Sequence, residues 1–485
     1  MSDISKLEPQ RLWRWFDTIC QIPHPSKHED ALAAHIVSWA QSRQLDVSRD
    51  SVGNIRIAKP ATAGMESRAG VIMQAHLDMV PQKTDDSHHD FTTDPILPYV
   101  DGEWVTATQT TLGADNGMGM AACLAVLESD DIAHGPLEVL LTIDEEAGMT
   151  GAFGLQSGWL QGEYLLNTDS EQEGEIYMGC AGGEDALITL PITWQTAPAD
   201  TTHLRIEISG LKGGHSGCDI DTGRANANQL LARLLSKAQN QFDFEISALS
   251  GGTLRNAIPR QAEVILHSKQ SLADWQSFVS AFEAELKAHL GHTETGLQCT
   301  LESSDAAKQT LTAASQIRLI SLLMAAPNGV MRMSDVIHGV VETSLNLGIV
   351  RLESDHASLC FLIRALLDEG KEMVKHQLTS LASLSESDIA FAGSYPGWAP
   401  DDQSPLMHLV KACYVDAYGF EPKINVIHAG LECGLFKQPY PHLDMISYGP
   451  TIKFPHSPDE KVEIASVAKF WQQTQLILAN IPQAK

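Results

Sequence analysis

The stretch that decides the fold is LEVLLTIDEE, residues 137–146, an apolar run that ends in three carboxylates. A short apolar run bounded by polar residues is typical of a buried strand. Two more runs follow the same pattern: residues 71–75 stop at His76, and residues 164–166 stop just before Asp169. The pattern predicts an open α/β sheet, in which ligands gather at the carboxyl ends of the strands.

The pattern changes near residue 185, where strand-like and helical segments alternate in two similar rounds. The glycine- and proline-rich stretch 393–400 is typical of a linker, and the tail returns to the α/β pattern. We therefore expect a catalytic domain with a mixed sheet flanked by helices, residues 1–184 and 397–485, interrupted by an inserted α+β domain of two similar halves, residues 185–396. The expected strands of the insert are 203–208, 262–267, 343–350 and 358–364, and its expected helices are 224–240, 272–289, 312–325 and 369–383.

Composition excludes several classes of protein. The chain has 485 residues and 33 Lys and Arg against 61 Asp and Glu, a formal net charge of −28. Nucleic-acid and anionic-membrane binding both need a basic surface, so we expect neither partner. No apolar segment is long enough to span a membrane, the N-terminus has no signal core, and the eight Cys form no C-x-x-C pair. These features predict a cytoplasmic location.

Five polar segments carry the imidazole and carboxylate groups that bind zinc. Taken singly, each has an ordinary interpretation: Asp115 suits a helix N-cap, and His456 an exposed loop. Taken together, two imidazoles and three carboxylates can serve two ions about 3.5–4 Å apart if one carboxylate is shared. The segments centre on His76, Asp115, Glu145–Glu146, Asp169 and His456.

The order of these segments resembles the zinc exopeptidase family that includes bacterial glutamate carboxypeptidase, aminoacylase and the carnosinases. The resemblance covers essentially the whole chain and is closest to the carnosinase-like branch. It implies hydrolysis of dipeptides, above all Xaa-His dipeptides such as β-alanyl-histidine. Further segments that carry it are AHLDMVPQK (75–83), TLGADNG (111–117), GGTLRNAIP (251–259) and HAGLECG (428–434).

The resemblance also implies the roles of the metal-type residues. Asp115 would bridge two Zn²⁺ ions, for which Co²⁺ or Mn²⁺ could substitute. Glu145 would be the general base for a water shared by both ions. The remaining ligands would be Glu146 and His456 at one ion, and His76 and Asp169 at the other. Asp78, two residues after His76, would orient its ring, as carboxylates near a ligating histidine commonly do.

The resemblance implies that the inserted domain is a lid, hinged near residues 185 and 396. His215, in the glycine-rich GGHSG at 213–217, would contact the substrate carbonyl. Arg364 would bind the substrate carboxylate, for which a guanidinium is well suited. Asn256 would donate a hydrogen bond, and Gly430 and Glu432 would line the pocket.

Three alternatives stay open. An N-acyl amino acid deacylase or a carboxypeptidase of the same family would share the metals and differ in whether the substrate has a free amino group. A non-catalytic binding protein could keep the fold, although the intact Glu145 argues against it. A homodimer is also open, because some relatives dimerise through the lid.

Overall fold

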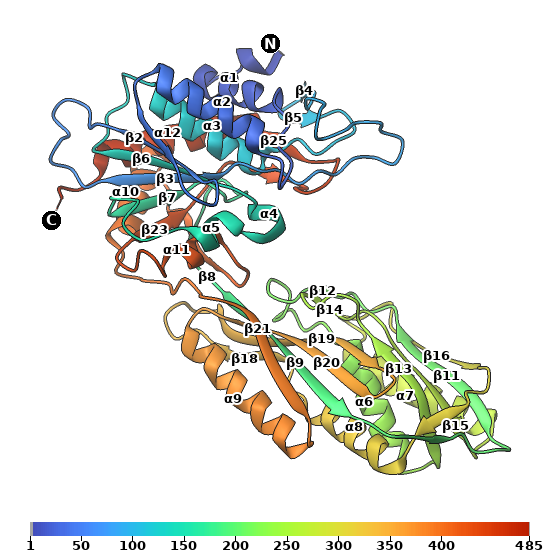
Figure 1. Cartoon of the computed structure of the whole chain (residues 1–485). Coiled ribbons are helices and arrows are strands. Elements are labelled where there is room, and N and C mark those ends of the chain that lie inside the picture. Colours follow the sequence, from blue (N-terminus) through green and yellow to red (C-terminus); the bar gives the residue numbers. More distant parts are fainter. Residues whose placement is uncertain (1–2, 485) are drawn as a thin grey trace. The chain divides into compact units, whose positions relative to one another are not determined.

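The computed structural model describes residues 3–484, which form two compact units. Unit 1 contains the chain up to Cys180, Trp398–Val426 and the chain from Leu431 onward. Unit 2 contains Ala181–Gly397 and the short segment Ile427–Gly430. Figure 1 shows the elements of each unit. No helix among residues 3–484 is long and apolar enough to span a membrane.

Unit 1 is built on an eight-stranded mixed sheet of order β1-β2-β6-β3-β7-β23-β8-β22. At its centre, β3 pairs in parallel with β6 and β7, and β7 in parallel with β23. Every residue of β3, β6 and β7 is buried, as expected of parallel strands covered on both faces. The central strands are β3 (Val71–His76), β6 (Leu137–Thr142), β7 (Tyr164–Asn167) and β23 (Asp444–Ser447).

The outer strands of this sheet run antiparallel to their neighbours where β1 meets β2, β2 meets β6 and β23 meets β8. A second, four-stranded sheet has the order β24-β25-β5-β4. The outer strands are β1 (Asp46–Arg49), β2 (Ile55–Lys59), β8 (Glu175–Cys180) and β22 (Lys423–Ile427). The small sheet consists of β4 (Pro98–Asp101), β5 (Trp104–Ala107), β24 (Ile452–Lys453) and β25 (Lys461–Glu463).

Helices cover the mixed sheet. Figure 1 shows α1, α2 and α3 together over one side of it, and α3 packs directly on β3. The Gly- and Ala-rich sequence of α3 lets this helix lie close to the sheet. The helices of unit 1 are η1 (Asp3–Lys6), α1 (Gln10–Cys20), α2 (Asp30–Ser42), α3 (Ala114–Glu128), α4 (Glu145–Gly148), α5 (Thr150–Gly154), α10 (Pro405–Tyr418), α11 (Glu432–Phe436) and α12 (Ile464–Asn480).

Unit 2 is built on a nine-stranded antiparallel sheet of order β16-β11-β15-β13-β19-β20-β9-β21, with β18 paired to β19. Burial alternates along β11 and β15, so one face of the sheet forms the core. The strands are β9 (Gly182–Pro191), β11 (Thr202–Ser209), β13 (Phe244–Gly251), β15 (Ala262–Ser268), β16 (Gln298–Ser303), β18 (Gly329–Met333), β19 (Val341–Leu352), β20 (His356–Ala365) and β21 (Asp388–Tyr395).

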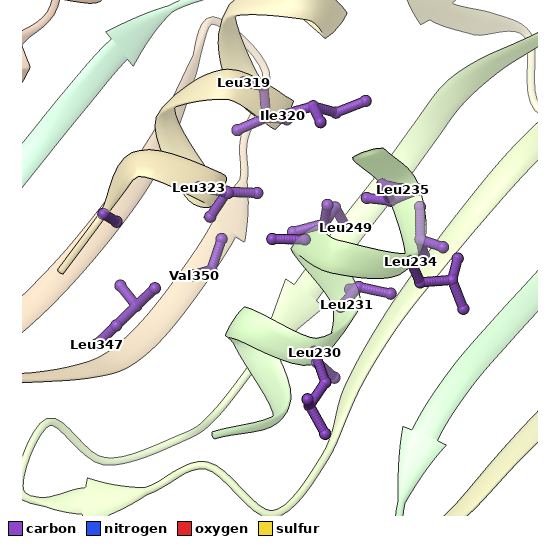
Figure 2. Packing of buried hydrophobic residues seen from close by; sticks show 14 of the residues in the cluster. Leu230, Leu231, Leu234, Leu235, Leu249, Leu319, Ile320, Leu323, Leu347 and Val350 are labelled. Atoms are coloured by element: carbon purple, nitrogen blue, oxygen red, sulfur yellow. The ribbon is translucent and has the colours of Figure 1, made fainter. Parts of the chain in front are cut away.

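The core of unit 2 lies between this sheet and four helices, which contribute leucine-rich faces. Figure 2 shows side chains from α6, α8, β13 and β19 meeting there. The helices are α6 (Ala227–Ala238), α7 (Leu272–Leu290), α8 (Ala313–Ala325) and α9 (Asp368–Leu384). Short strand pairs outside the main sheet are β10 (Trp194–Thr196) with β17 (Gln309–Leu311), and β12 (Gly214–His215) with β14 (Ala257–Ile258).

The structure contains every strand and helix expected in the insert, within a few residues of the predicted bounds. Five strands of its sheet were missed: β9, β13, β16, β18 and β21. The linker interpretation of 393–400 is wrong at its start, because β21 runs to Tyr395 and pairs with β9. Strand β21 carries only a short apolar alternation, Ile389 and Phe391, before its exposed Gly-Ser-Tyr end, which is too short a pattern to mark a strand.

The core of unit 2 gives a stability prediction. Leu234 in α6 is 0% exposed, so Leu234→Ala leaves a cavity, and we expect the free energy of unfolding of unit 2 to fall by about 2–5 kcal/mol. Leu384→Ala, at the 86% exposed last residue of α9, is the matched control and should change it by less than about 0.5 kcal/mol. Hydrogen exchange measured by mass spectrometry reads unit 2 separately from unit 1. Equal effects of the two substitutions would contradict the packing described.

Candidate functional site

The candidate site of unit 1 forms where three parallel strands end. His76 is the last residue of β3, Glu145 and Glu146 follow β6, and Asp169 follows β7. Because the carboxyl ends of parallel strands meet at one edge of a sheet, these side chains lie close together. Asp115 reaches the same edge from the start of α3, where its φ of −87° and ψ of 108° are not helical.

Asp115 lies between two histidines. Its Oδ1 is 3.3 Å from His76 Nε2, and its Oδ2 is 3.2 Å from Nε2 of His456, which comes from the loop after β24. His76 Nε2 is also 3.1 Å from Asp169 Oδ1, and His456 Nε2 is 3.0 Å from Glu146 Oε1. The structure thus brings all five predicted ligands together as two groups of three that share Asp115, each with ligand atoms within 4.8 Å of one another.

The charges of the two groups fit a pair of cations. Burial disfavours the charged form of His76, yet Asp169, Asp115 and Asp78 together raise its pKa well above the ordinary value. The carboxylates of Asp115 and Glu146, which accept from the His456 ring, raise the pKa of His456 to about 11.

Burial also raises the pKa of Asp169 to about 7, although His76 lowers it. The site therefore holds more buried negative charge than its imidazoles neutralise, and an imidazole–carboxylate donor set is one that zinc accepts.

Asp78 supports this site from behind. Its Oδ1 lies 3.3 Å from His76 Nδ1, which leaves Nε2 of that ring facing the other carboxylates. Asp78 also accepts hydrogen bonds from Ser26 Oγ at 2.7 Å and from the backbone N–H groups of Glu145 at 2.9 Å and Glu146 at 3.2 Å. Burial raises its pKa, but His76 and these donors lower it to about 2. One buried carboxylate thus orients both a histidine and the Glu145–Glu146 backbone.

Glu145 stands beside the two groups without a fixed partner. One of its carboxylate oxygens lies within 4.8 Å of ligand atoms of His76 and Glu146. Its carboxylate makes no hydrogen bond or ion pair with any residue in the 3–484 range. Burial raises its pKa well above the ordinary value; His76 opposes this, and Asp169, Glu432 and Glu146 add to it. A free, unusually basic carboxylate at this position is suited to accept a proton.

Glu460, which the sequence analysis missed, holds the loop that carries Asp115. Its carboxylate accepts four backbone hydrogen bonds: from Leu112 at 2.9 Å, Gly113 at 3.1 Å, Ala114 at 2.8 Å and Asp115 at 3.3 Å. Burial, together with the charge of Asp115, raises the pKa of Glu460 to about 7. Its only sequence signal is its place four residues after His456.

Asn116 is a second residue that sequence reasoning missed. Its Nδ2 donates to Asp169 Oδ1 and, at 2.9 Å, to the carbonyl of Thr168. Gly119, one turn further along α3, makes room for this contact, because a Cβ there would come within 2.3 Å of Asn116 Oδ1 and Thr168 Oγ1. The small residues of α3 therefore position a ligand as well as pack the helix.

In unit 2, His215 and Arg364 lie together. Arg364 is only 5% exposed; its guanidinium lies 3.2 Å from His215 Nε2 and donates at 3.3 Å to Ser216 Oγ and at 3.5 Å to the Tyr395 hydroxyl. None of the described residues supplies a carboxylate in contact with it. Because a buried guanidinium with neutral partners needs an anion, this site suits a carboxylate.

His215 is held uncharged by the same surroundings. Burial and the nearby Arg364 lower its pKa to about 4. Its Nδ1 accepts hydrogen bonds from the backbone N–H groups of Gly217 at 3.3 Å and Cys218 at 3.1 Å. Two backbone donors at Nδ1 favour the tautomer that has its proton on Nε2, the atom that also lies 3.2 Å from Arg364 Nη2.

The other predicted substrate residues differ in placement. Asn256 is exposed in unit 2, and its carbonyl accepts from Ser216 N at 2.9 Å. Gly430 ends the segment Ile427–Gly430, which joins unit 2 through a 2.8 Å hydrogen bond between His428 Nε2 and Ser344 Oγ.

Glu432 is fully buried in unit 1, where its carboxylate accepts hydrogen bonds from Gln74 Nε2 at 2.6 Å and Thr142 Oγ1 at 2.9 Å. Burial raises its pKa to about 8. This burial fits a supporting role behind the metal-type residues better than contact with substrate.

Comparison with known proteins decides the family. The model of peptidase family M20/M25/M40 matches residues 72–478, a range that contains every metal-type residue of the site. The chain belongs to this family. Its membership confirms the resemblance drawn from the sequence motifs.

Two relatives resemble this M20 chain along its whole length. It is 53% identical over 483 residues to the cytosol non-specific dipeptidase of Escherichia coli (strain K12), covering 99% of this chain and 100% of the relative. The crystal structure of aminoacylhistidine dipeptidase from Vibrio alginolyticus is similar with a TM-score of 0.94 at 55% identity, covering 100% of this chain and 99% of that one. The mixed central sheet and the separate antiparallel sheet are thus those of an M20 dipeptidase fold.

A more distant structure shares the fold alone. The tripeptidase from Staphylococcus aureus has a TM-score of 0.55 at 15% identity, covering 98% of this chain and 99% of that one.

The role of Glu460 gives a prediction for metal binding. Glu460→Gln replaces one acceptor oxygen by a donor, so two of the four backbone hydrogen bonds are lost and the Asp115 loop loosens. We expect zinc affinity to fall about 10- to 100-fold, as for other residues that orient metal ligands. Competition with a chelator, followed by mass spectrometry of retained zinc, measures it. Glu463→Gln, whose side chain makes no hydrogen bond among the described residues, is the control, and an equal loss in both variants would refute the assignment.

Proposed function

We propose that this M20 chain is a cytoplasmic two-zinc dipeptidase that hydrolyses Xaa-His dipeptides, including β-alanyl-histidine. The observation that carries the proposal is the shared Asp115 between two groups of metal-type ligands. The names of the two full-length relatives, a cytosol non-specific dipeptidase and an aminoacylhistidine dipeptidase, support the substrate class and the location.

In this proposal His76 and Asp169 would hold one zinc ion, Glu146 and His456 would hold the other, and Asp115 would be a ligand in both groups. Zinc supplies Lewis-acid chemistry: when bound, it polarises the scissile carbonyl and lowers the pKa of water from about 15.7 to about 7. The second oxygen of Asp115 makes the sharing feasible, since each oxygen already faces a different histidine. Co²⁺ or Mn²⁺ could bind the same ligands.

Glu145 acts as the general base. It takes a proton from the attacking water and passes it to the leaving amine nitrogen. A group that accepts and then returns a proton works best with a pKa near the working pH, and burial moves the pKa of Glu145 upward from its ordinary value. Asp78 holds the Glu145 backbone, so the base keeps its position through both transfers.

Unit 2 contributes the groups that recognise the peptide, and we infer that residues 185–396 act as a lid of two similar halves. Neutral His215 donates its Nε2–H to the carbonyl oxygen as negative charge develops there. Arg364 binds the C-terminal carboxylate of the substrate. That carboxylate supplies the negative charge that the buried guanidinium does not find among its protein partners. Asn256 donates a hydrogen bond to the substrate, and Gly430 lines its pocket.

The function is tested with zinc-loaded protein against β-alanyl-histidine, glycyl-leucine and an N-acetyl amino acid. We expect cleavage of both dipeptides, with the higher kcat/KM for β-alanyl-histidine, and little cleavage of the N-acetyl compound. Preference for the N-acetyl compound would point instead to a deacylase of the same family. A zinc-loaded protein inert to all three would favour a binding protein.

Glu145→Gln separates base from ligand. Because the amide cannot accept the proton, kcat should fall about 10²- to 10⁴-fold while both zinc ions stay bound. Steady-state kinetics and metal analysis by mass spectrometry on the same sample measure the two effects. Glu103→Gln, at an exposed glutamate, controls for the loss of a surface charge. Loss of both ions from Glu145→Gln would show that Glu145 is a ligand.

Asp115→Ala tests the shared carboxylate. Since one oxygen faces each histidine, its removal should lower zinc occupancy at both sites together, and activity should be lost with it. Asp169→Ala is the comparison, because Asp169 belongs to one group only and its loss should release one ion. Release of a single ion from Asp115→Ala would rule out bridging.

A further inference from the structure

Three buried polar side chains, Glu432, Gln74 and Asn167, form a line of hydrogen bonds behind the metal-type residues of unit 1, called here the amide network. Gln74 of β3 and Asn167 of β7 are register partners across two parallel strands. Asn167 Nδ2 donates to Gln74 Oε1 at 2.5 Å, and Gln74 Nε2 donates to Glu432 Oε2 at 2.6 Å. All three side chains are 0% exposed, so bulk water does not compete for these contacts.

One end of the amide network reaches a metal-type residue. Asn167 Oδ1 accepts the backbone N–H of Asp169 at 3.2 Å. Asp169 is the residue whose Oδ1 lies 3.1 Å from His76 Nε2. Asn116 holds the Asp169 carboxylate from α3, and the amide network holds the Asp169 backbone. The direction in which this ligand points therefore depends on Asn167 as well as on Asn116.

Glu432, at the other end, sets the direction of every hydrogen bond in the amide network. A side-chain amide has a donor end and an acceptor end, and turning it round exchanges the two. Glu432 Oε2 accepts whether or not the other oxygen carries a proton, so it holds the Nε2 end of Gln74. Gln74 then presents Oε1 to Asn167, and Asn167 in turn presents Oδ1 to the Asp169 N–H.

Thr142 touches the same groups but does not set this direction. Its Oγ1 donates to Glu432 Oε2 at 2.9 Å and accepts from Gln74 Nε2 at 3.2 Å. A hydroxyl can donate as well as accept, so it would serve either orientation of Gln74. If Gln74 and Asn167 both turned round, Asn167 would present Nδ2 to the N–H of Asp169. Two buried donors would then face each other, and the Asp169 backbone would lose its partner.

We propose that Glu432 is a positioning residue, which acts through Gln74 and Asn167 to hold Asp169 in the orientation that binds metal. The inference rests on the proposed two-zinc function and adds to it a residue that touches neither zinc nor substrate. Asp169 belongs to the group of His76 and not to that of His456, so the amide network concerns one zinc ion of the two.

The test compares two substitutions of Glu432. Glu432→Leu removes the acceptor, and we expect the affinity for one zinc ion to fall about 10- to 100-fold, as for other residues behind metal ligands. Glu432→Gln keeps an oxygen where the Gln74 and Thr142 donors meet, so both zinc affinities should stay within about threefold. Chelator competition followed by mass spectrometry of retained zinc measures both affinities. Equal losses in the two variants would mean that only the charge of Glu432 matters, and would overturn the proposal.

Thr142→Val is the matched control, because it removes the second donor to Glu432 in the same buried place and leaves the amide network intact. Both zinc affinities should stay within about threefold of those of the unmodified protein. The zinc concentration that gives half-maximal cleavage of glycyl-leucine should rise in Glu432→Leu alone, while KM at saturating zinc stays the same. A loss of zinc in Thr142→Val as large as in Glu432→Leu would assign the effect to packing and overturn the proposal.

A second comparison guards against misfolding of Glu432→Leu, which leaves buried donors unpaired. Gln74→Met interrupts the amide network at its centre and should weaken the same zinc ion about 10- to 100-fold. Gln74→Met combined with Glu432→Leu removes both partners of one contact, which costs less stability than removing one. The combined variant should lose no more zinc affinity than Gln74→Met, because both changes interrupt the same network. Additive losses would overturn the proposal.

The zinc measurements keep this inference distinct from the proposed function. If the unmodified protein binds two zinc ions and cleaves no dipeptide, the dipeptidase proposal fails, and the zinc affinities of the variants still decide the role of Glu432. If the unmodified protein does not bind two zinc ions, both proposals are overturned.

Discussion

One carboxylate touching two imidazoles is the constraint on which unit 1 depends. Asp115 Oδ1 lies 3.3 Å from His76 Nε2, and Asp115 Oδ2 lies 3.2 Å from His456 Nε2. His76 is on strand β3 of the mixed sheet, and His456 comes from the C-terminal part of the chain. The contact exists only if β3, the start of α3 and the loop after β24 are all in place. The segments before and after unit 2 in the sequence must therefore fold together to make the site.

Such a concentration of buried carboxylates opposes folding unless its geometry is fixed by other contacts. Two carboxylates do this with backbone hydrogen bonds: Glu460 accepts four from the Asp115 loop, and Asp78 accepts those of Glu145 and Glu146. Backbone donors stabilise negative charge without adding a competing cation. The ligands are thus ordered before a metal binds, so less of the metal's binding energy is spent on ordering them.

Whether a part of the site could be predicted from the sequence depended on how far apart in the sequence the contacting residues lie. His76, Glu145 and Asp169 follow apolar runs, and the rule that parallel strands end at one edge is enough to bring them together. Asp115 and His456 needed the family resemblance, because an N-cap and a loop histidine have the same local pattern. Glu460 was missed because the backbone that it holds, such as that of Ala114, is distant from it in the sequence. Asn116 was missed because it looks like an ordinary helix residue and its partner Asp169 is also distant in the sequence. Strand β21 was missed because its apolar alternation is limited to Ile389 and Phe391 and the Gly-Ser-Tyr end that follows is typical of a loop.

A histidine in each unit has its pKa shifted in the opposite direction by its surroundings. In unit 1, Asp115 and Glu146 raise the pKa of His456 to about 11. The carboxylates around this ring therefore favour a positive charge beside them, which suits a cation site. In unit 2, burial and Arg364 lower the pKa of His215 to about 4, so its ring stays neutral near pH 7. A neutral ring can donate a hydrogen bond next to a guanidinium without placing two positive charges together. In the proposed function, the pairing of His215 with Arg364 lets one small region offer a donor to a carbonyl and a cation to a carboxylate, the two groups that flank the leaving residue of a dipeptide.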